Sequence, residues 1–249
     1  MRLAGHTAAE VLRRTAEVVK AGVSTKAVDE AAGQFMSEAG CRSAFLGYRG
    51  FPGRICISLN EEVVHGIGRA DRIIQNGDIV KIDVGITKGG WIGDNALTVA
   101  VGMVSPEVHQ LLRVTEESLL TAVSHAVPGG QLRTLCGSVE KLVRRYGFSV
   151  VQQFVGHGVG KQLHEAPEVP NFDNGRIKVR LEPGMVLAIE PMVNVGTPEV
   201  VVLSDRWTAV TRDRKASSHF EHTVVVTEDG PEILTPRARV TAPLAVPVV

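Results

Sequence analysis

Apolar residues recur at helical spacing in four stretches of the chain, and residues that typically begin or end a helix bound them. Ser105 and Pro106 open the third stretch with a capping hydroxyl followed by proline. Gly147 follows the fourth stretch, at the position where glycine commonly ends a helix. The predicted helices cover about residues 7–20, 25–39, 106–126 and 132–146.

Segments rich in Ile and Val alternate with these helices and predict strands. The turn Lys88-Gly89-Gly90 joins two of them as a hairpin. Two helices followed by strands occur twice, which indicates two similar halves within one domain, residues 1–234. Prolines among small apolar residues predict that residues 235–249 form a flexible tail. The predicted strands cover residues 54–59, 78–86, 91–101, 149–155, 185–193, 200–203 and 222–226.

The composition excludes several classes of function. With 27 Lys+Arg and 27 Asp+Glu, the chain has no net charge with which to bind nucleic acid or an anionic membrane. An aromatic content of 4% argues against platforms for base stacking. Cys41, Cys56 and Cys136 form no CxxC pair and indicate reduced thiols. The sequence has no apolar signal core and no apolar stretch of about 18 residues. We therefore expect a cytoplasmic protein and, by default, a monomer.

Two aspartates stand on the predicted hairpin. Asp83 lies among apolar residues, where a carboxylate is costly unless it is paired or bound to a cation. Pairing Trp91 with Lys88 places Asp94 close to opposite Asp83, and like charges that face each other destabilise a sheet. A divalent cation would remove the repulsion, and oxygen ligands suit Mn, Fe, Co or Zn. The alternative for Asp83 alone is a strand-end residue that caps the turn.

A histidine and two glutamates extend this set. His157 lies between Gly156 and Gly158, which let the backbone approach a ligand closely. Glu190 and Glu221 each adjoin a predicted strand, and taken singly each is typical of a surface acid. Four acids and a histidine beside buried strands instead favour a site with two metals about 3.5 Å apart, bridged by carboxylates.

Six short segments resemble the methionine aminopeptidases. The order Asp, Asp, His, Glu, Glu and the ten-residue gap between Asp83 and Asp94 make the resemblance specific, although X-Pro peptidases and creatinase relatives share the metal ligands, and the similarity runs from about residue 3 to residue 234. It implies an α+β pita-bread fold, two pseudo-symmetric halves with antiparallel sheet around a central dinuclear metal site and helices outside. The segments are NEEVVHG (60–66), KIDV (81–84), GD (93–94), GHGVG (156–160) with HEAP (164–167), IEP (189–191) and EHT (221–223).

The resemblance also implies the ligands of two divalent ions, which could be Co, Mn, Fe, Zn or Ni. Asp94 and Glu221 would bridge the metals, Asp83 would complete one shell, and His157 and Glu190 the other. A metal-held hydroxide would attack the first peptide bond.

Further roles are implied for Glu190 as proton acceptor, His164 as a donor to the scissile carbonyl oxygen, and His65 at the scissile amide nitrogen. An apolar pocket for the methionine side chain would be built from Tyr48, Phe51, Cys56 and Trp207. The sequence departs from the family at Arg49, where histidine is frequent, and at Leu163, where phenylalanine is common. These two departures bear on substrate affinity rather than on the metal chemistry.

The expected function is removal of the initiator methionine from nascent polypeptides, with the ribosome as a candidate place of encounter. No zinc-finger or basic extension precedes the matched segments and no insertion separates His164 from Glu190, which favours the type I enzymes. One alternative is an X-Pro aminopeptidase or creatinase-like hydrolase, although such relatives carry an extra N-terminal domain. Another is a non-catalytic pita-bread protein that binds RNA or protein.

Overall fold

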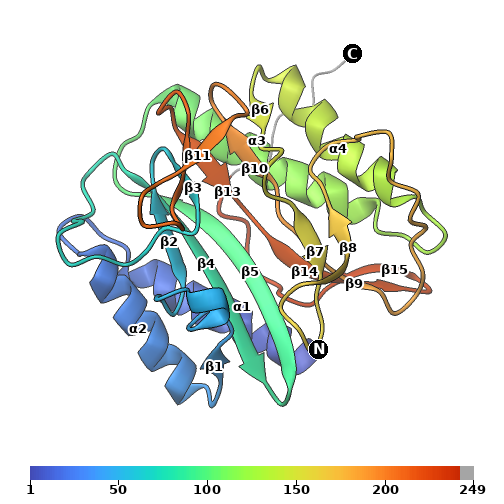
Figure 1. The fold of residues 1–249 in the computed structure, drawn as a ribbon, viewed down its shortest axis with the longest axis horizontal. Coiled ribbons are helices and arrows are strands. Elements are labelled where there is room, and N and C mark those ends of the chain that lie inside the picture. The colour runs from blue at the N-terminus through green and yellow to red at the C-terminus, as the bar shows by residue number, and fades with distance from the viewer. Residues whose placement is uncertain (242–249) are drawn as a thin grey trace.

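The computed structural model describes residues 1–241. Its first half is a pair of helices over an antiparallel sheet (Figure 1). Helix α1 packs against β4 and β5, and Ser24 caps α2 by accepting a hydrogen bond from the Ala27 amide. The elements are α1 (Arg2–Val18), α2 (Thr25–Glu38), β1 (Arg42–Ser43), β2 (Cys56–Leu59), β4 (Ile79–Lys88) and β5 (Trp91–Ala100), with the single 3₁₀ turn η1 (Tyr48–Gly50).

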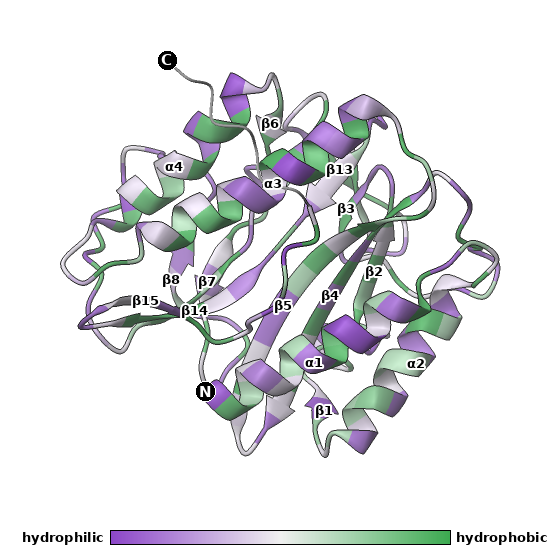
Figure 2. Cartoon of the chain, turned by 180° about the vertical axis from the view of Figure 1, so that it is seen from behind, coloured by the Kyte–Doolittle hydropathy of each residue, from purple (hydrophilic) through white to green (hydrophobic). Residues whose placement is uncertain are grey.

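The second half repeats this plan with α3 (Pro106–Ser124) and α4 (Leu132–Arg145). These helices cover two sheets, as the view from behind shows (Figure 2). The sheet of five strands has the order β15 (Gly230–Ile233), β14 (His222–Thr227), β9 (Val186–Ile189), β7 (Gly156–Gly158), β8 (Glu165–Val169). A sheet of three strands has the order β13 (Ser217–His219), β10 (Met192–Asn194), β6 (Ser149–Val150). A further small sheet holds β11 (Val200–Val202), β12 (Ala209–Thr211) and β3 (Glu62–Val64). The expected α+β architecture of two halves is confirmed.

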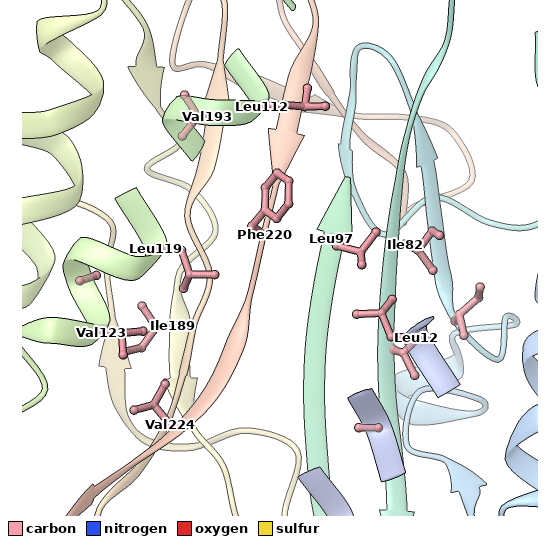
Figure 3. Packing of buried hydrophobic residues seen from close by; sticks show 14 of the residues in the cluster. Leu12, Ile82, Leu97, Leu112, Leu119, Val123, Ile189, Val193, Phe220 and Val224 are labelled. Carbon is pink, nitrogen blue, oxygen red and sulfur yellow. The ribbon is translucent and has the colours of Figure 1, made fainter. Parts of the chain in front are cut away.

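The hydrophobic core lies on the helix side of both halves (Figure 3). Leu12 of α1 and Ile82 of β4 belong to this cluster in the first half, and Leu119 of α3 and Ile189 of β9 belong to it in the second half. All four side chains are fully buried. The core therefore fixes the positions of the strands, while the opposite side of the hairpin of β4 and β5 carries Lys81, Asp83 and Asp94.

The register of the hairpin corrects one sequence expectation. Lys88 pairs with Trp91 as predicted, but this register places Asp83 opposite Ala96 and Asp94 opposite Gly85. The two aspartates are therefore diagonal neighbours on one face of the sheet rather than directly facing residues. Diagonal side chains are about 7–8 Å apart at their backbones and can still meet.

Two predicted strands differ in extent. The segment 185–193 is two strands, β9 and β10, separated at Glu190 and Pro191. Only Ser149 and Val150 of the segment 149–155 pair as a strand. Proline lacks the N–H that would continue the ladder, so the chain turns at Pro191 and joins a different sheet.

The predicted flexible tail is wrong for residues 235–241. Thr235 is fully buried, and the Glu116 carboxylate accepts hydrogen bonds from the Val240 amide and from the amide and hydroxyl of Thr241. Arg237 donates to the Glu221 carbonyl oxygen at 2.8 Å. Residues 242–249, the rest of that prediction, lie outside the described residues. Over residues 1–241, every helix is too short or too polar to cross a membrane.

Candidate metal centre and substrate cavity

Three carboxylates converge where the two halves meet. Asp83 comes from β4, Asp94 from β5 and Glu221 from the residue before β14, and one oxygen of each lies within 4.8 Å of the others. Asp94 and Glu221 are 3% and 2% exposed. Asp83 Oδ1, Asp94 Oδ1 and Glu221 Oε1 are buried without a hydrogen-bond partner among the described residues. Buried oxygens of this kind are costly unless a cation or a proton satisfies them.

Hydrogen bonds between the halves, one of them backbone to backbone and two made by a threonine hydroxyl, hold two of these acids together. The Glu221 amide donates to the Ala96 carbonyl at 2.9 Å. The Thr223 hydroxyl donates to the Asp94 carbonyl at 2.7 Å and accepts from the Asp94 amide at 3.1 Å. The position of Asp94 relative to Glu221 is thus set by β5 and β14, not by flexible side chains alone.

His157 faces the same cluster from β7. Its Nδ1 lies 2.9 Å from the Gly158 carbonyl oxygen, which can only accept, so Nδ1 carries the proton. Nε2 is left with a free lone pair, 3.9 Å from Asp94 Oδ2 and 3.6 Å from Glu190 Oε1. A backbone carbonyl that fixes the tautomer in this way is typical of histidines that bind metals.

The electrostatics of the cluster favour neutral groups in the absence of a cation. Burial raises the pKa of Asp94 to about 7. Burial and the neighbouring acids raise the pKa values of Asp83, Glu190 and Glu221 well above their ordinary range. Burial lowers the pKa of His157 to about 4, so its imidazole is neutral at pH 7 and able to bind a metal. These residues therefore fit a divalent ion.

His65 and His164 lie at the edges of the same site. The His164 ring centroid is 4.2 Å from that of His157, and Tyr48 Oη is 2.8 Å from His164 Nδ1. His65 has a left-handed backbone (φ 60°), and its ring packs edge-on against Phe154 at 5.2 Å. Burial lowers the pKa of His65 to about 4. Burial and the charge of Arg49 lower that of His164.

A cavity of about 280 Å³ connects these groups. Its lining includes the seven predicted metal and catalytic residues, the four predicted pocket residues, and both Arg49 and Leu163. Phe51 and Trp207 form an edge-to-face pair at 5.1 Å. The cavity therefore has an acidic and histidine-rich part beside an apolar, aromatic part, which suits a ligand with one polar and one apolar end.

The structure adds residues that the sequence analysis did not single out. Phe45 and Phe154 also line the cavity. His219 is 1% exposed, and its Nε2 lies 3.6 Å from Glu190 Oε2. Nothing local marks these residues in the sequence, apart from the position of His219 two residues before Glu221.

Comparison with known proteins gives a consistent result. The model of Metallopeptidase family M24 matches residues 1–228. Methionine aminopeptidase 1 of Bacillus subtilis (strain 168) is 46% identical over 235 residues, which are 94% of this chain and 94% of that protein. The crystal structure of methionine aminopeptidase from Thermotoga maritima is 41% identical, with a TM-score of 0.93 over 95% of each chain. Prolidase from Pyrococcus furiosus shares the fold, with a TM-score of 0.77 and 24% identity, and the match covers 96% of this chain and 63% of that one.

Proposed function

The chain belongs to metallopeptidase family M24 and is a metal-dependent hydrolase similar to the methionine aminopeptidases, and we propose that it removes the initiator methionine from newly made polypeptides. The observation that carries the proposal is the convergence of three carboxylates within 4.8 Å, those of Asp94 and Glu221 buried and that of Asp83 partly buried, in an otherwise largely apolar cavity. The carboxylates suit a metal and the cavity suits an apolar side chain.

We propose that the site holds two divalent ions. Asp94 and Glu221 are the candidates for shared ligands, because Asp94 lies near both Asp83 and His157. Asp83 would serve one ion, and His157 with Glu190 would serve the other. When bound, such ions supply positive charge and bring the pKa of water toward neutrality. The donor set does not select among Co, Mn, Fe, Zn and Ni.

The chain's own side chains would do the remaining chemistry. Glu190 borders the cluster and is the candidate to accept a proton during attack. If the Tyr48 hydroxyl donates to His164 Nδ1, the His164 proton lies on Nε2 and can be donated to the scissile carbonyl oxygen. His65, which also lines the cavity, is the candidate to contact the scissile amide nitrogen.

The apolar part of the cavity would hold the methionine side chain. Tyr48, Phe51 and Trp207 present aromatic surfaces, which interact favourably with a thioether sulfur. Burial raises the pKa of Cys56 well above its ordinary value, so its thiol is uncharged and serves as part of the apolar lining. We further propose that the protein acts as a monomer on nascent chains in the cytoplasm, where the ribosome supplies its substrate.

The alternatives receive less support. An X-Pro peptidase shares the fold, but the likeness to prolidase, at 24% identity, extends to the fold alone. A non-catalytic binding protein is disfavoured because all five proposed ligands are present and brought together.

The test is release of methionine from Met-Ala-Ser before chelation, after chelation with EDTA, and after each metal is restored, with Ala-Pro-Ser as the competing substrate. We expect release to stop on chelation and to return with at least one metal, while Ala-Pro-Ser stays intact. Cleavage of Ala-Pro-Ser without cleavage of Met-Ala-Ser would indicate an X-Pro peptidase. No hydrolysis of either peptide with any metal would favour the binding protein.

A further inference from the structure

One cation stands among the acids and apolar groups that line the cavity. Of the described lining residues, Arg49 is the sole lysine or arginine, and the four other charged side chains are the acids of the metal cluster. Arg49 is exposed, whereas Asp94, Glu221 and His157 are buried. The cavity thus has its negative groups inside and its positive group at the solvent side.

The backbone holds Arg49 in an unusual conformation. Arg49 has φ 48° in the turn η1, between Gly47 at φ 83° and Gly50 at φ 89°. The Gly47 amide closes the turn by donating to the Phe51 carbonyl at 2.8 Å. Left-handed residues other than glycine are uncommon and concentrate at functional positions. Here the strained residue presents a charged side chain beside the cavity.

The Arg49 side chain lies next to the groups that would hold the scissile bond. Its guanidinium carbon is 5.4 Å from the centroid of the Tyr48 ring, and Tyr48 contacts His164. No carboxylate within residues 1–241 forms an ion pair with it, so its charge is open to a ligand. Since His164 and Arg49 are both exposed, together they mark the opening of the cavity.

The direction of the substrate follows from the proposed function. The methionine would occupy the apolar part, with the first peptide bond between the metal cluster and His164. The rest of the peptide must leave through the opening, and two extended residues span about 7 Å. The side chain of the third residue would therefore pass close to Arg49.

We infer that Arg49 is a specificity-determining residue, which favours substrates with an acidic third residue and disfavours those with lysine there. This inference rests on the proposed function. The pair would be solvent-exposed, so its effect on kcat/KM is expected to be roughly two- to fivefold at low salt. It should shrink at 0.5 M NaCl, because salt screens exposed charges.

The test compares kcat/KM for the amidated peptides Met-Ala-Asp-Gly, Met-Ala-Ser-Gly and Met-Ala-Lys-Gly. The enzymes are the parent, Arg49→Gln, Arg49→Glu and, as a control of equal charge change, Arg145→Gln at the exposed end of α4. Amidation removes the terminal carboxylate, which could otherwise bind Arg49 itself.

In the parent and in Arg145→Gln, we expect kcat/KM to fall in the order Asp, Ser, Lys for the third residue of the peptide. We expect equal kcat/KM values for the three peptides in Arg49→Gln and the reverse order in Arg49→Glu. Equal Asp-to-Lys ratios in all four enzymes, with Met-Ala-Ser-Gly cleaved normally, would overturn the inference while leaving the proposed function intact. If the parent with metal cleaves none of the three peptides, the proposed function itself is wrong.

Discussion

Replacing Asp94 by asparagine should stabilise the metal-free protein while removing its activity. The substitution keeps the shape of the side chain and removes a charge that is 3% exposed and lies among other buried carboxylates. Asp94 Oδ1 has no hydrogen-bond partner among the described residues, and burial outweighs the Asn95 backbone hydrogen bond that favours the charged form.

The size and the pH window of this effect follow from the pKa of Asp94. Its ordinary value is 3.8, and burial raises it to about 7 in the folded protein. Between these values the unfolded chain loses the proton and the folded chain keeps it. The metal-free parent therefore loses stability as pH rises from about 4 to 7, by roughly 4 kcal/mol. Asparagine has no proton to lose, so the variant avoids this loss.

The assay is urea and thermal unfolding in EDTA at pH 5, 6, 7 and 8. We expect Asp94→Asn to exceed the parent by a margin that grows with pH to about 4 kcal/mol, or roughly 10 °C in Tm, at pH 8. The control, Asp229→Asn, changes an exposed turn residue and should leave unfolding unchanged at every pH. A variant less stable than the parent at pH 8, or a difference that does not vary with pH, would show that burial of the Asp94 carboxylate does not destabilise the metal-free protein.

Three further predictions address the cavity and the C-terminal segment. His164→Ala should lower kcat for Met-Ala-Ser about 100-fold with little change in KM, since its donor would act on charge developing in the transition state; an unchanged kcat contradicts this role. Trp207→Ala should lower kcat/KM at least roughly tenfold, because a large apolar contact with methionine is lost; an unchanged value places methionine elsewhere. Glu116→Ala should lower the free energy of unfolding by about 2 kcal/mol, since its carboxylate accepts three hydrogen bonds from residues 240 and 241. The control Glu117→Ala removes one partly exposed ion pair and should lower the free energy of unfolding by under about 1 kcal/mol. Equal losses in urea melts would show that residues 235–241 are not held by Glu116.

Local chemistry explains which parts of the fold could be predicted from the sequence. Ser24 and Ser105 cap helices through their own side chains, and Gly147 ends α4 at φ 79°. Each signal acts within a few residues of the boundary that it sets. By contrast, β7 has three residues, two of them glycine, and shows no periodicity from which a strand could be predicted.

The site was predictable to a lesser degree from physical reasoning alone. The hairpin turn brings Asp83 and Asp94 to one face, although the true register makes them diagonal. Glu221 joins them only through pairing between distant strands, so its place rested on the family resemblance. The hydrogen bonds from residues 240 and 241 to the Glu116 carboxylate join positions more than a hundred residues apart, and no short-range pattern in the sequence predicts them.

The most direct test of the account is methionine release by Asp94→Ala, measured with Met-Ala-Ser under saturating Co, Mn, Fe, Zn and Ni in turn, beside the parent. Asp94 lies between Asp83 and His157, so its loss should remove the shared ligand of the proposed pair of metals. We expect release to be abolished with every metal while the variant unfolds as cooperatively as the parent. Substantial release with any one metal would contradict the assignment of Asp94 as the bridge and with it the proposed dinuclear centre.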